Sequence, residues 1–124
     1  MPFTIGALYT RAEISRQFGG NPQAYLPFRD GRVTCGCFNT DRNPRAPREI
    51  LVGDGTDIMK AADMLVRQGG STPVFMKRGS QKWEYLGPYR VERSSKDMNE
   101  IRPKAAEARR SDVTMLLQLA PVED

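Results

Sequence analysis

The sequence predicts an α+β domain in which a curled or barrel-like mixed β-sheet is combined with two to three helices. Three observations predict this class. The chain has 124 residues, of which 39% are hydrophobic, and this is the size of one domain with a single core, residues 1–124. Short apolar runs separated by glycine-containing turns indicate several strands. Two capped segments with helical periodicity lie between these runs, and mixed elements of this size favour an α+β architecture.

The ionisable residues restrict the possible functions. The formal net charge is +4, and arginine outnumbers lysine, 14 to 5. Arginine matches phosphate well, but a GC-rich genome enriches arginine too, so composition does not establish a nucleic-acid partner. The chain has no histidine, which removes the commonest general base and the usual zinc ligand. We therefore expect no catalytic residues, no metal and no cofactor.

The distribution of apolar residues indicates where the protein resides. No apolar run approaches the roughly 20 residues that a membrane-spanning helix needs. The N-terminal residues lack the basic leader and the apolar stretch of a signal peptide. We expect a cytoplasmic protein with no membrane partner.

The first expected helix follows Thr10. Thr10 and Glu13 have the spacing of a capping box, Ile14 and Phe18 share one helical face, and Gly19-Gly20 ends the helix. A loop from Gly19 to Pro27 follows, and its glycines and polar residues permit close approach of a ligand.

Two strands are expected next, residues 32–38 and 49–52. The first contains Cys35 and Cys37 on one face, which we interpret as small buried residues because two thiols cannot complete a zinc site. Gly36 between them indicates a bulge or a group packed closely against the backbone.

The second expected helix spans residues 57–68 and ends at Gly69-Gly70. We interpret Asp54, Thr56 and Asp57 as its N-terminal caps, because the Gly-Asp-Gly turn before it lacks the further residues of a phosphate-binding loop. Its buried stripe is expected to comprise Ile58, Ala61, Ala62, Leu65 and Val66.

The last third of the chain contains the most informative segment. Strands are expected at 72–77 and 82–86 around a turn at Gly79 and Ser80, and a third at 89–93 after the break at Gly87-Pro88. The segment holds the only tryptophan and two of the four tyrosines among several cations, a combination that suits a flat anionic partner. A short helix at 103–109 and a core strand at 113–120 follow.

Residues 73–91 resemble part of the SRA domains, which read methylated cytosine in DNA. The resemblance rests on Pro73-Val74-Phe75-Met76-Lys77-Arg78-Gly79 and on Trp83-Glu84-Tyr85-Leu86-Gly87-Pro88-Tyr89-Arg90-Val91. Leu86 replaces the signature aspartate, and the insert between the two parts is short. The resemblance implies the wider PUA-like superfold, and the sequence is also similar to bacterial modules found beside HNH restriction nucleases.

The resemblance implies a modified base flipped from the duplex into an aromatic pocket. Tyr85 and Tyr89 match its aromatic positions, and Trp83 shares a strand face with Tyr85. Residue type and loop position add the remaining candidates, so that the expected base pocket comprises Tyr25, Phe38, Asn39, Asp54, Trp83, Tyr85 and Tyr89, with Thr40 and Asp41 as further polar candidates. The expected phosphate contacts are Arg29, Arg32, Arg42, Arg45, Arg78 and Lys82.

Four functions remain open from the sequence. The leading hypothesis is a non-catalytic module that binds nucleic acid, DNA rather than RNA, with a nuclease domain or chain as a second partner. The alternative is a protein of the same fold that binds a nucleotide or a cyclic dinucleotide. A metal-dependent enzyme using Asp54 or Asp57 ranks lower. In a purely structural reading, the aromatic segment is core or a dimer contact.

Overall fold

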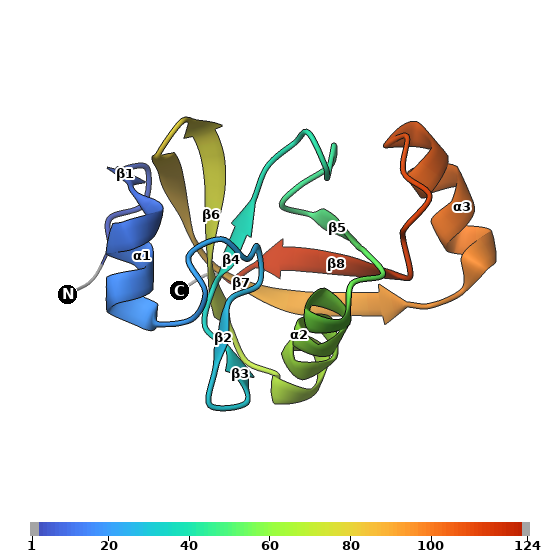
Figure 1. Ribbon diagram of the computed structural model, residues 1–124, viewed down its shortest axis with the longest axis horizontal. Coiled ribbons are helices and arrows are strands. Elements are labelled where there is room, and N and C mark those ends of the chain that lie inside the picture. The colour runs from blue at the N-terminus through green and yellow to red at the C-terminus, as the bar shows by residue number, and fades with distance from the viewer. Residues whose placement is uncertain (1–2, 123–124) are drawn as a thin grey trace.

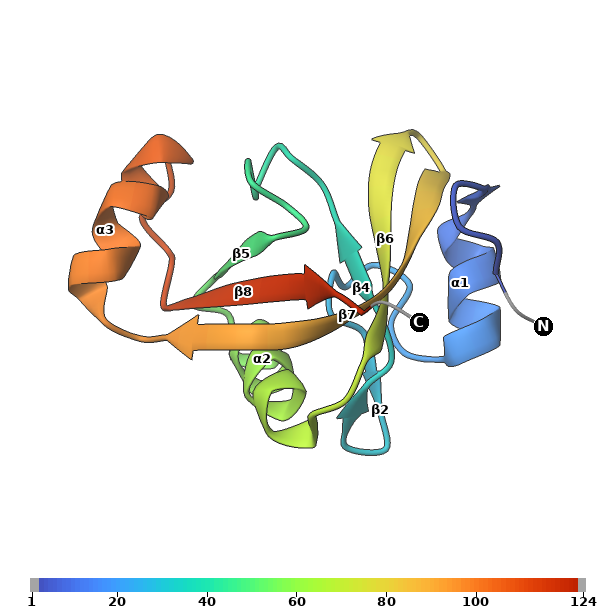
Figure 2. The ribbon, with the colours of Figure 1, turned by 180° about the vertical axis from the view of Figure 1, so that it is seen from behind.

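The computed structural model describes residues 3–122 as a curled mixed sheet with three helices (Figures 1 and 2). The strand order is β4-β6-β7-β8-β5, β1 pairs with β7, and a separate hairpin is formed by β2 and β3. Among the strands of residues 3–122, only the β4–β6 pair is parallel. The elements are β1 Leu8–Tyr9, α1 Arg11–Phe18, β2 Phe28–Arg29, β3 Arg32–Val33, β4 Gly36–Phe38, β5 Glu49–Val52, α2 Thr56–Gln68, β6 Thr72–Gly79, β7 Lys82–Ser95, α3 Met98–Glu107 and β8 Met115–Pro121. The expected α+β class is confirmed.

Strand β6 separates two hydrophobic clusters, because alternate side chains of a strand point to opposite faces. Val74 and Met76 belong to the first core cluster, which includes the buried residues of α2, whereas Phe75 between them belongs to the second. The second core cluster consists of Ile14, Cys35, Cys37, Phe75 and Trp83, with Phe3, Tyr9, Phe18 and Tyr85 packed against it. Helix α1 therefore covers one face of the sheet at β6 and α2 covers the other (Figure 1).

A third cluster joins α3 to the far end of the sheet. Leu51 and Leu116 of β5 and β8 pack against Ile101 and Ala105 of α3. Figures 1 and 2 place α3 at one end of the molecule and α1 at the other. Among the described residues, no helix is both long enough and apolar enough to cross a membrane.

Helix α1 begins as the capping box predicts. The Glu13 backbone N donates to Thr10 Oγ1 at 3.1 Å, and the Thr10 backbone N donates to Glu13 Oε1 at 2.9 Å. The helix ends at Gly19, whose φ of 79° is readily available only to glycine. The expected start and end of this helix are confirmed.

The strand expected at 32–38 is instead two short strands in different sheets, β3 and β4. The Thr34 backbone N still donates to the Pro27 carbonyl at 2.9 Å, in register with the β2–β3 pairs, and β4 then pairs in parallel with β6. Both cysteines are buried and free, with their sulfurs 3.9 Å apart, as expected. The expectation for Gly36 is also confirmed, since a Cβ there would lie 2.6 Å from the Phe38 ring.

The strand expected at 49–52 is confirmed as β5, but the predicted caps of α2 are wrong. The N-cap is Gly55 and no side chain caps this end. Asp54, Thr56 and Asp57 are exposed. The buried face of α2 includes Met64, which was not predicted, whereas Val66, which was predicted to be buried, is 36% exposed.

Strand β7 is continuous from Lys82 to Ser95, so the break expected at Gly87-Pro88 is wrong. Instead, the pairing with β6 shifts: Phe75 faces Tyr85 and Val74 faces Gly87, which leaves Leu86 as an extra residue. Such a bulge reverses the faces of the residues that follow. Tyr85 consequently packs on the second core cluster and Tyr89 on the first.

Helix α3 spans Met98–Glu107 and not the expected 103–109. Its N-cap is Asp97, whose side chain accepts a hydrogen bond from the Asn99 backbone N at 2.9 Å. Pro103 lies inside the helix. The strand expected at 113–120 is β8, Met115–Pro121.

Candidate functional site

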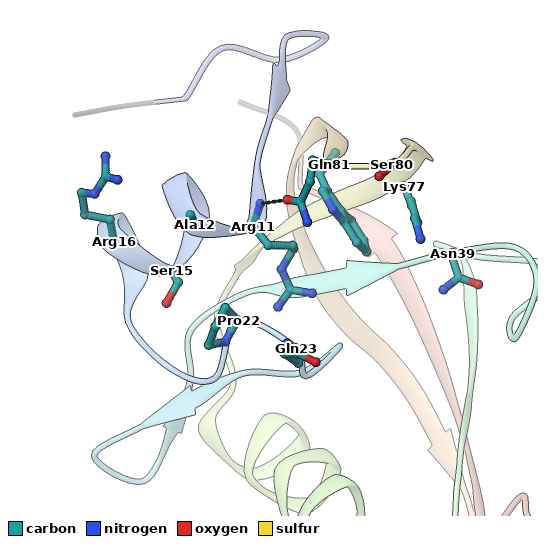
Figure 3. Close-up of a pocket in the computed structure, with 11 residues that line it drawn as sticks. Arg11, Ala12, Ser15, Arg16, Pro22, Gln23, Asn39, Lys77, Ser80 and Gln81 are labelled. Carbon is teal, nitrogen blue, oxygen red and sulfur yellow. Dashed lines mark hydrogen bonds between the residues drawn. The ribbon is translucent and has the colours of Figure 1, made fainter.

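A broad hollow of the described surface lies between α1 and the β6–β7 hairpin (Figure 3). We call it the α1–hairpin groove. Its volume is about 890 Å³, within the range of small-molecule sites. It is lined by Arg11, Ala12, Ser15, Arg16, Pro22, Gln23, Asn39, Lys77, Ser80, Gln81 and Trp83.

The groove is positively charged. Of the 11 described residues that line it, three are cationic, namely Arg11, Arg16 and Lys77, and none is Asp or Glu. Figure 3 shows Arg11 extending into the space between α1 and the hairpin, with Lys77 on the hairpin side and Arg16 at the outer edge. A concave surface with cations of one sign attracts anions.

Arg11 is held in place from several sides although it carries a charge. The residue is only 8% exposed. Its backbone N donates to Gln81 Oε1 in the hairpin turn at 3.1 Å, and its Nη2 donates to the Ala24 carbonyl at 2.7 Å and to the Asn21 carbonyl at 3.4 Å. Its Nε is buried and has no hydrogen-bond partner within the described residues.

Trp83 forms the apolar wall of the groove and is covered by cations. The Arg11 Cζ lies 5.1 Å from the centroid of the Trp83 ring and the Lys77 Nζ lies 6.0 Å from it, distances typical of cation–π contacts. Trp83 is only 7% exposed. Its ring therefore offers little free surface on which a base could stack.

Tyr85 lies on the same face as Trp83, as predicted, but it packs into the core and not the groove. Its ring is 5.0 Å from the Phe75 ring and 6.0 Å from the Phe3 ring. Burial raises the pKa of its hydroxyl.

A second group of predicted pocket residues meets at the end of β5. The Tyr25 ring contacts the Phe38 ring edge-on at 6.3 Å, and the Tyr25 hydroxyl lies 3.5 Å from the Gly53 backbone N. Desolvation raises the pKa of the Tyr25 hydroxyl. Asp54 follows Gly53 and is exposed. Tyr25 also lines a smaller cavity of about 390 Å³ beside α2.

The predicted base-pocket residues thus fall in different places. Trp83 and Asn39 line the α1–hairpin groove. Tyr25 contacts Phe38 and lies beside Gly53, which precedes Asp54. Tyr85 and Tyr89 pack on opposite faces of the sheet. Thr40 and Asp41 are exposed on the loop after β4.

The predicted phosphate contacts lie in three parts of the surface. Arg29 and Arg32 face each other across the β2–β3 hairpin, Arg42 and Arg45 lie on the loop before β5, and Arg78 and Lys82 lie at the tip of the β6–β7 hairpin. Figures 1 and 2 show the two hairpins at opposite edges of the molecule.

Four of these arginines contact carboxylates. Arg45 makes a bidentate contact with Glu107 at 2.9 and 2.8 Å, and the remaining pairs are Arg29–Asp30 at 3.7 Å, Arg42–Asp112 at 3.3 Å and Arg78–Glu84 at 2.7 Å. Within residues 3–122, no ion pair is found for Arg32 or Lys82.

Sequence reasoning missed the contribution of α1 to the groove. Arg11 and Ser15 are four residues apart, as are Ala12 and Arg16, and residues at this spacing lie near one another on a helix surface. That spacing was visible in the sequence, but nothing in it indicated that the hairpin turn would lie against α1.

The α+β fold of this chain is similar to the fold of SRA domains. The structure is similar to the SRA domain of SUVH5, solved as a complex with hemi methylated CG DNA, with a TM-score of 0.67 over 100% of this chain and 91% of that chain. The two sequences are 12% identical, so the similarity concerns the fold. Residues 8–113 match the family described as a domain of unknown function, DUF6697, and the chain belongs to this family. No match was found among curated proteins.

Proposed function

We propose that this protein is a non-catalytic module that binds DNA and recognises a modified base. The observation that carries the proposal is the SRA-like fold, which extends over the whole chain and is shared with a domain solved on hemi methylated CG DNA. A fold alone does not determine a function, so the chemistry must come from this chain's own side chains.

In the proposed complex, the modified base leaves the duplex and packs against Tyr25, which lines the smaller cavity beside α2. Phe38 is buried and supports the Tyr25 ring from behind, and the exposed Asp54 follows Gly53, whose backbone N lies 3.5 Å from the Tyr25 hydroxyl. Aromatic contacts and a polar group that reads the base edge are what a flipped base requires. Asn39, which follows Phe38 and lines the α1–hairpin groove, is a further candidate for base contact.

The DNA backbone supplies the remaining contacts in this proposal. Arg32 and Lys82 carry charges that no described carboxylate neutralises, and they are exposed. Arg29, Arg42, Arg45 and Arg78 would exchange surface carboxylates for phosphates, which is inexpensive because exposed ion pairs contribute only about 0–1 kcal/mol each.

We further propose that catalysis, if coupled to this binding, belongs to a separate nuclease domain or chain. An HNH centre requires histidine, and the chain has none. Among residues 3–122, no group of three His, Cys, Asp or Glu side chains is placed to hold a metal ion.

The test is fluorescence anisotropy with short duplexes that differ only at one central CG step. They carry unmodified, hemimethylated, fully methylated or hydroxymethylated cytosine, or a methylated adenine nearby, and each is measured at two salt concentrations. Preference of at least about tenfold for one modified duplex, retained at the higher salt, supports the proposal, since phosphate contacts weaken with salt for all duplexes alike. Equal binding to all duplexes overturns modified-base recognition.

Two charge-matched variants separate base recognition from general electrostatics. D54N removes the exposed carboxylate beside Gly53, and D30N removes an exposed carboxylate at the turn of the β2–β3 hairpin, where φ is 53° and asparagine is tolerated. We expect D54N to reduce the preference for the modified duplex and D30N to leave it unchanged. Equal preferences in both variants would exclude Asp54 from base recognition.

A second candidate function is supported by the size of the α1–hairpin groove. A volume of about 890 Å³ accommodates a nucleotide or a cyclic dinucleotide. This function predicts binding of a free nucleotide that exceeds binding of any duplex at the same salt concentration, measured in the same series.

A further inference from the structure

We propose that the α1–hairpin groove is a phosphate-binding site in which Arg11 is the central donor and Arg16 and Lys77 flank it. This inference goes beyond the proposed function, because a phosphate can be held here whether or not a base is recognised near Tyr25. It also concerns residues of α1 that the SRA resemblance does not include.

The hydrogen bonds of Arg11 leave donors for a ligand. A guanidinium has five N–H groups, and the contacts to Ala24 and Asn21 both come from Nη2. Nε is buried without a partner within residues 3–122. Leaving a buried polar group unpaired costs about 1–3 kcal/mol, and an acceptor oxygen bound in the groove would remove that penalty.

The guanidinium is also fixed in orientation before any ligand arrives. The contact with the Trp83 ring and the hydrogen bond from Nη2 to the Ala24 carbonyl restrain the plane of the guanidinium. The hydrogen bond from the Arg11 backbone N to the Gln81 side chain connects the start of α1 to the hairpin turn. A planar fork that is already oriented loses little entropy on binding, and its geometry matches phosphate oxygens.

The charges around the groove favour phosphate over a neutral base. Arg11, Arg16 and Lys77 have no carboxylate partner within the described chain, whereas Arg42, Arg45 and Arg78 elsewhere on the surface are each paired with one. The groove therefore gathers three cationic side chains that no described carboxylate neutralises. Trp83 is 7% exposed and is already in contact with two cations, so stacking of a base on its ring is disfavoured.

The phosphate can come from a nucleic-acid backbone or from a free nucleotide. Both present the same anionic oxygens to Arg11. The groove volume of about 890 Å³ is large enough for a phosphate together with the sugar attached to it. The two sources are distinguished by the experiment and not by the chemistry of the site.

Trp83 provides the measurement, because it is the only tryptophan of the chain and lines the groove. Its fluorescence is titrated with inorganic pyrophosphate and, separately, with an unmodified 12-base-pair duplex. We expect a saturable change in emission. K77Q and R16Q, both at exposed positions, should each weaken binding about fivefold or more. R67Q, at an exposed position of α2 that does not line the groove, is the matched control and should change it less than twofold.

R11K tests the central residue while keeping the charge. Because Arg11 also holds the loop before β2, thermal unfolding is measured first, and the exposed-site variants keep the proposal testable if R11K does not fold. A folded R11K should bind at least tenfold more weakly, since lysine lacks the planar fork. Wild-type affinity in folded R11K would overturn the role of Arg11.

The outcomes separate this inference from the proposed function. A fluorescence response that weakens in K77Q and R16Q but not in R67Q supports the groove, even if modified and unmodified duplexes bind equally. If the duplex is the source, each variant should also lower the slope of log K against log salt by about 1. Stronger binding of inorganic pyrophosphate than of the duplex assigns the site to the phosphate groups of a free nucleotide. No response to either probe, or equal weakening in R67Q, overturns the inference.

Discussion

Replacing Arg110 by methionine should remove an anchor that joins three segments of the chain. The Arg110 side chain is only 7% exposed. Its Nη1 donates to the Leu51 carbonyl at 3.0 Å and to the Arg42 carbonyl at 3.1 Å, and its Nε and Nη2 donate to the Asp112 carboxylate at 2.9 and 3.0 Å. It therefore connects the segment before β8 with β5 and with the loop that precedes β5.

The expected loss follows from what R110M leaves unpaired. Removing one partner of a buried ion pair costs about 3–5 kcal/mol. The Asp112 side chain is 31% exposed and still lies 3.3 Å from Arg42, so water and Arg42 compensate part of its lost contact. We therefore expect a free energy of unfolding about 3 kcal/mol below that of the wild type, which corresponds to a decrease in Tm of about 10 °C for a chain of this length.

The assay is urea unfolding followed by Trp83 fluorescence and by far-ultraviolet circular dichroism. R102M is the control, because Arg102 is exposed on α3 and has no ion pair within residues 3–122, so its effect should stay within about 0.5 kcal/mol. A loss below about 1 kcal/mol in R110M, or one equal to that of R102M, would refute the reasoning that Arg110 anchors these segments.

Three further predictions concern stability. T10A removes the capping box of α1 and should lower the free energy of unfolding by about 1 kcal/mol in urea unfolding; an unchanged midpoint would contradict the cap. G36A places a methyl group 2.6 Å from the Phe38 ring and should cost about 1–3 kcal/mol, and a neutral result would show that the ring moves aside freely. The Arg110 guanidinium lowers the pKa of Asp112, so the stability from this pair is fully present above the unfolded pKa of about 3.9 and is lost as pH falls through the lower folded pKa. The difference in Tm between wild type and R110M should therefore shrink below about pH 4, and a constant difference down to pH 2 would be inconsistent with this ion pair.

Local chemistry made several elements predictable. The capping box at Thr10 acts between residues three apart, so it requires no knowledge of the rest of the chain. Strand β5 is short and apolar, and Gly36 is flanked by small buried residues, so both were identified from composition and spacing alone. Burial of the two cysteines followed in the same way.

Contacts between distant segments account for the errors. Strand β7 shifts its register against β6 at Leu86, which forms a bulge. This pairing keeps β7 continuous through Gly87-Pro88, a dipeptide that by itself predicts a break between two strands. The strand expected at 32–38 is divided because β3 pairs with β2 in a separate hairpin, whereas β4 pairs with β6 of the main sheet. Asp54 and Asp57 have the composition of helix caps, but Asp57 lies within the first turn of α2 and Gly55 is its N-cap.

The candidate sites divide along the same line. The sequence identified the residue types, since the only tryptophan, the tyrosines and the arginines are visible without coordinates. Its local patterns also determined the α+β class, because periodicity, caps and turns depend on near neighbours. Only the tertiary structure decided that Gln81 of the hairpin turn would bond to the backbone of Arg11 and so form a cationic groove between α1 and the sheet. That contact joins residues 70 positions apart, and no local propensity specifies which distant side chain will meet the start of a helix.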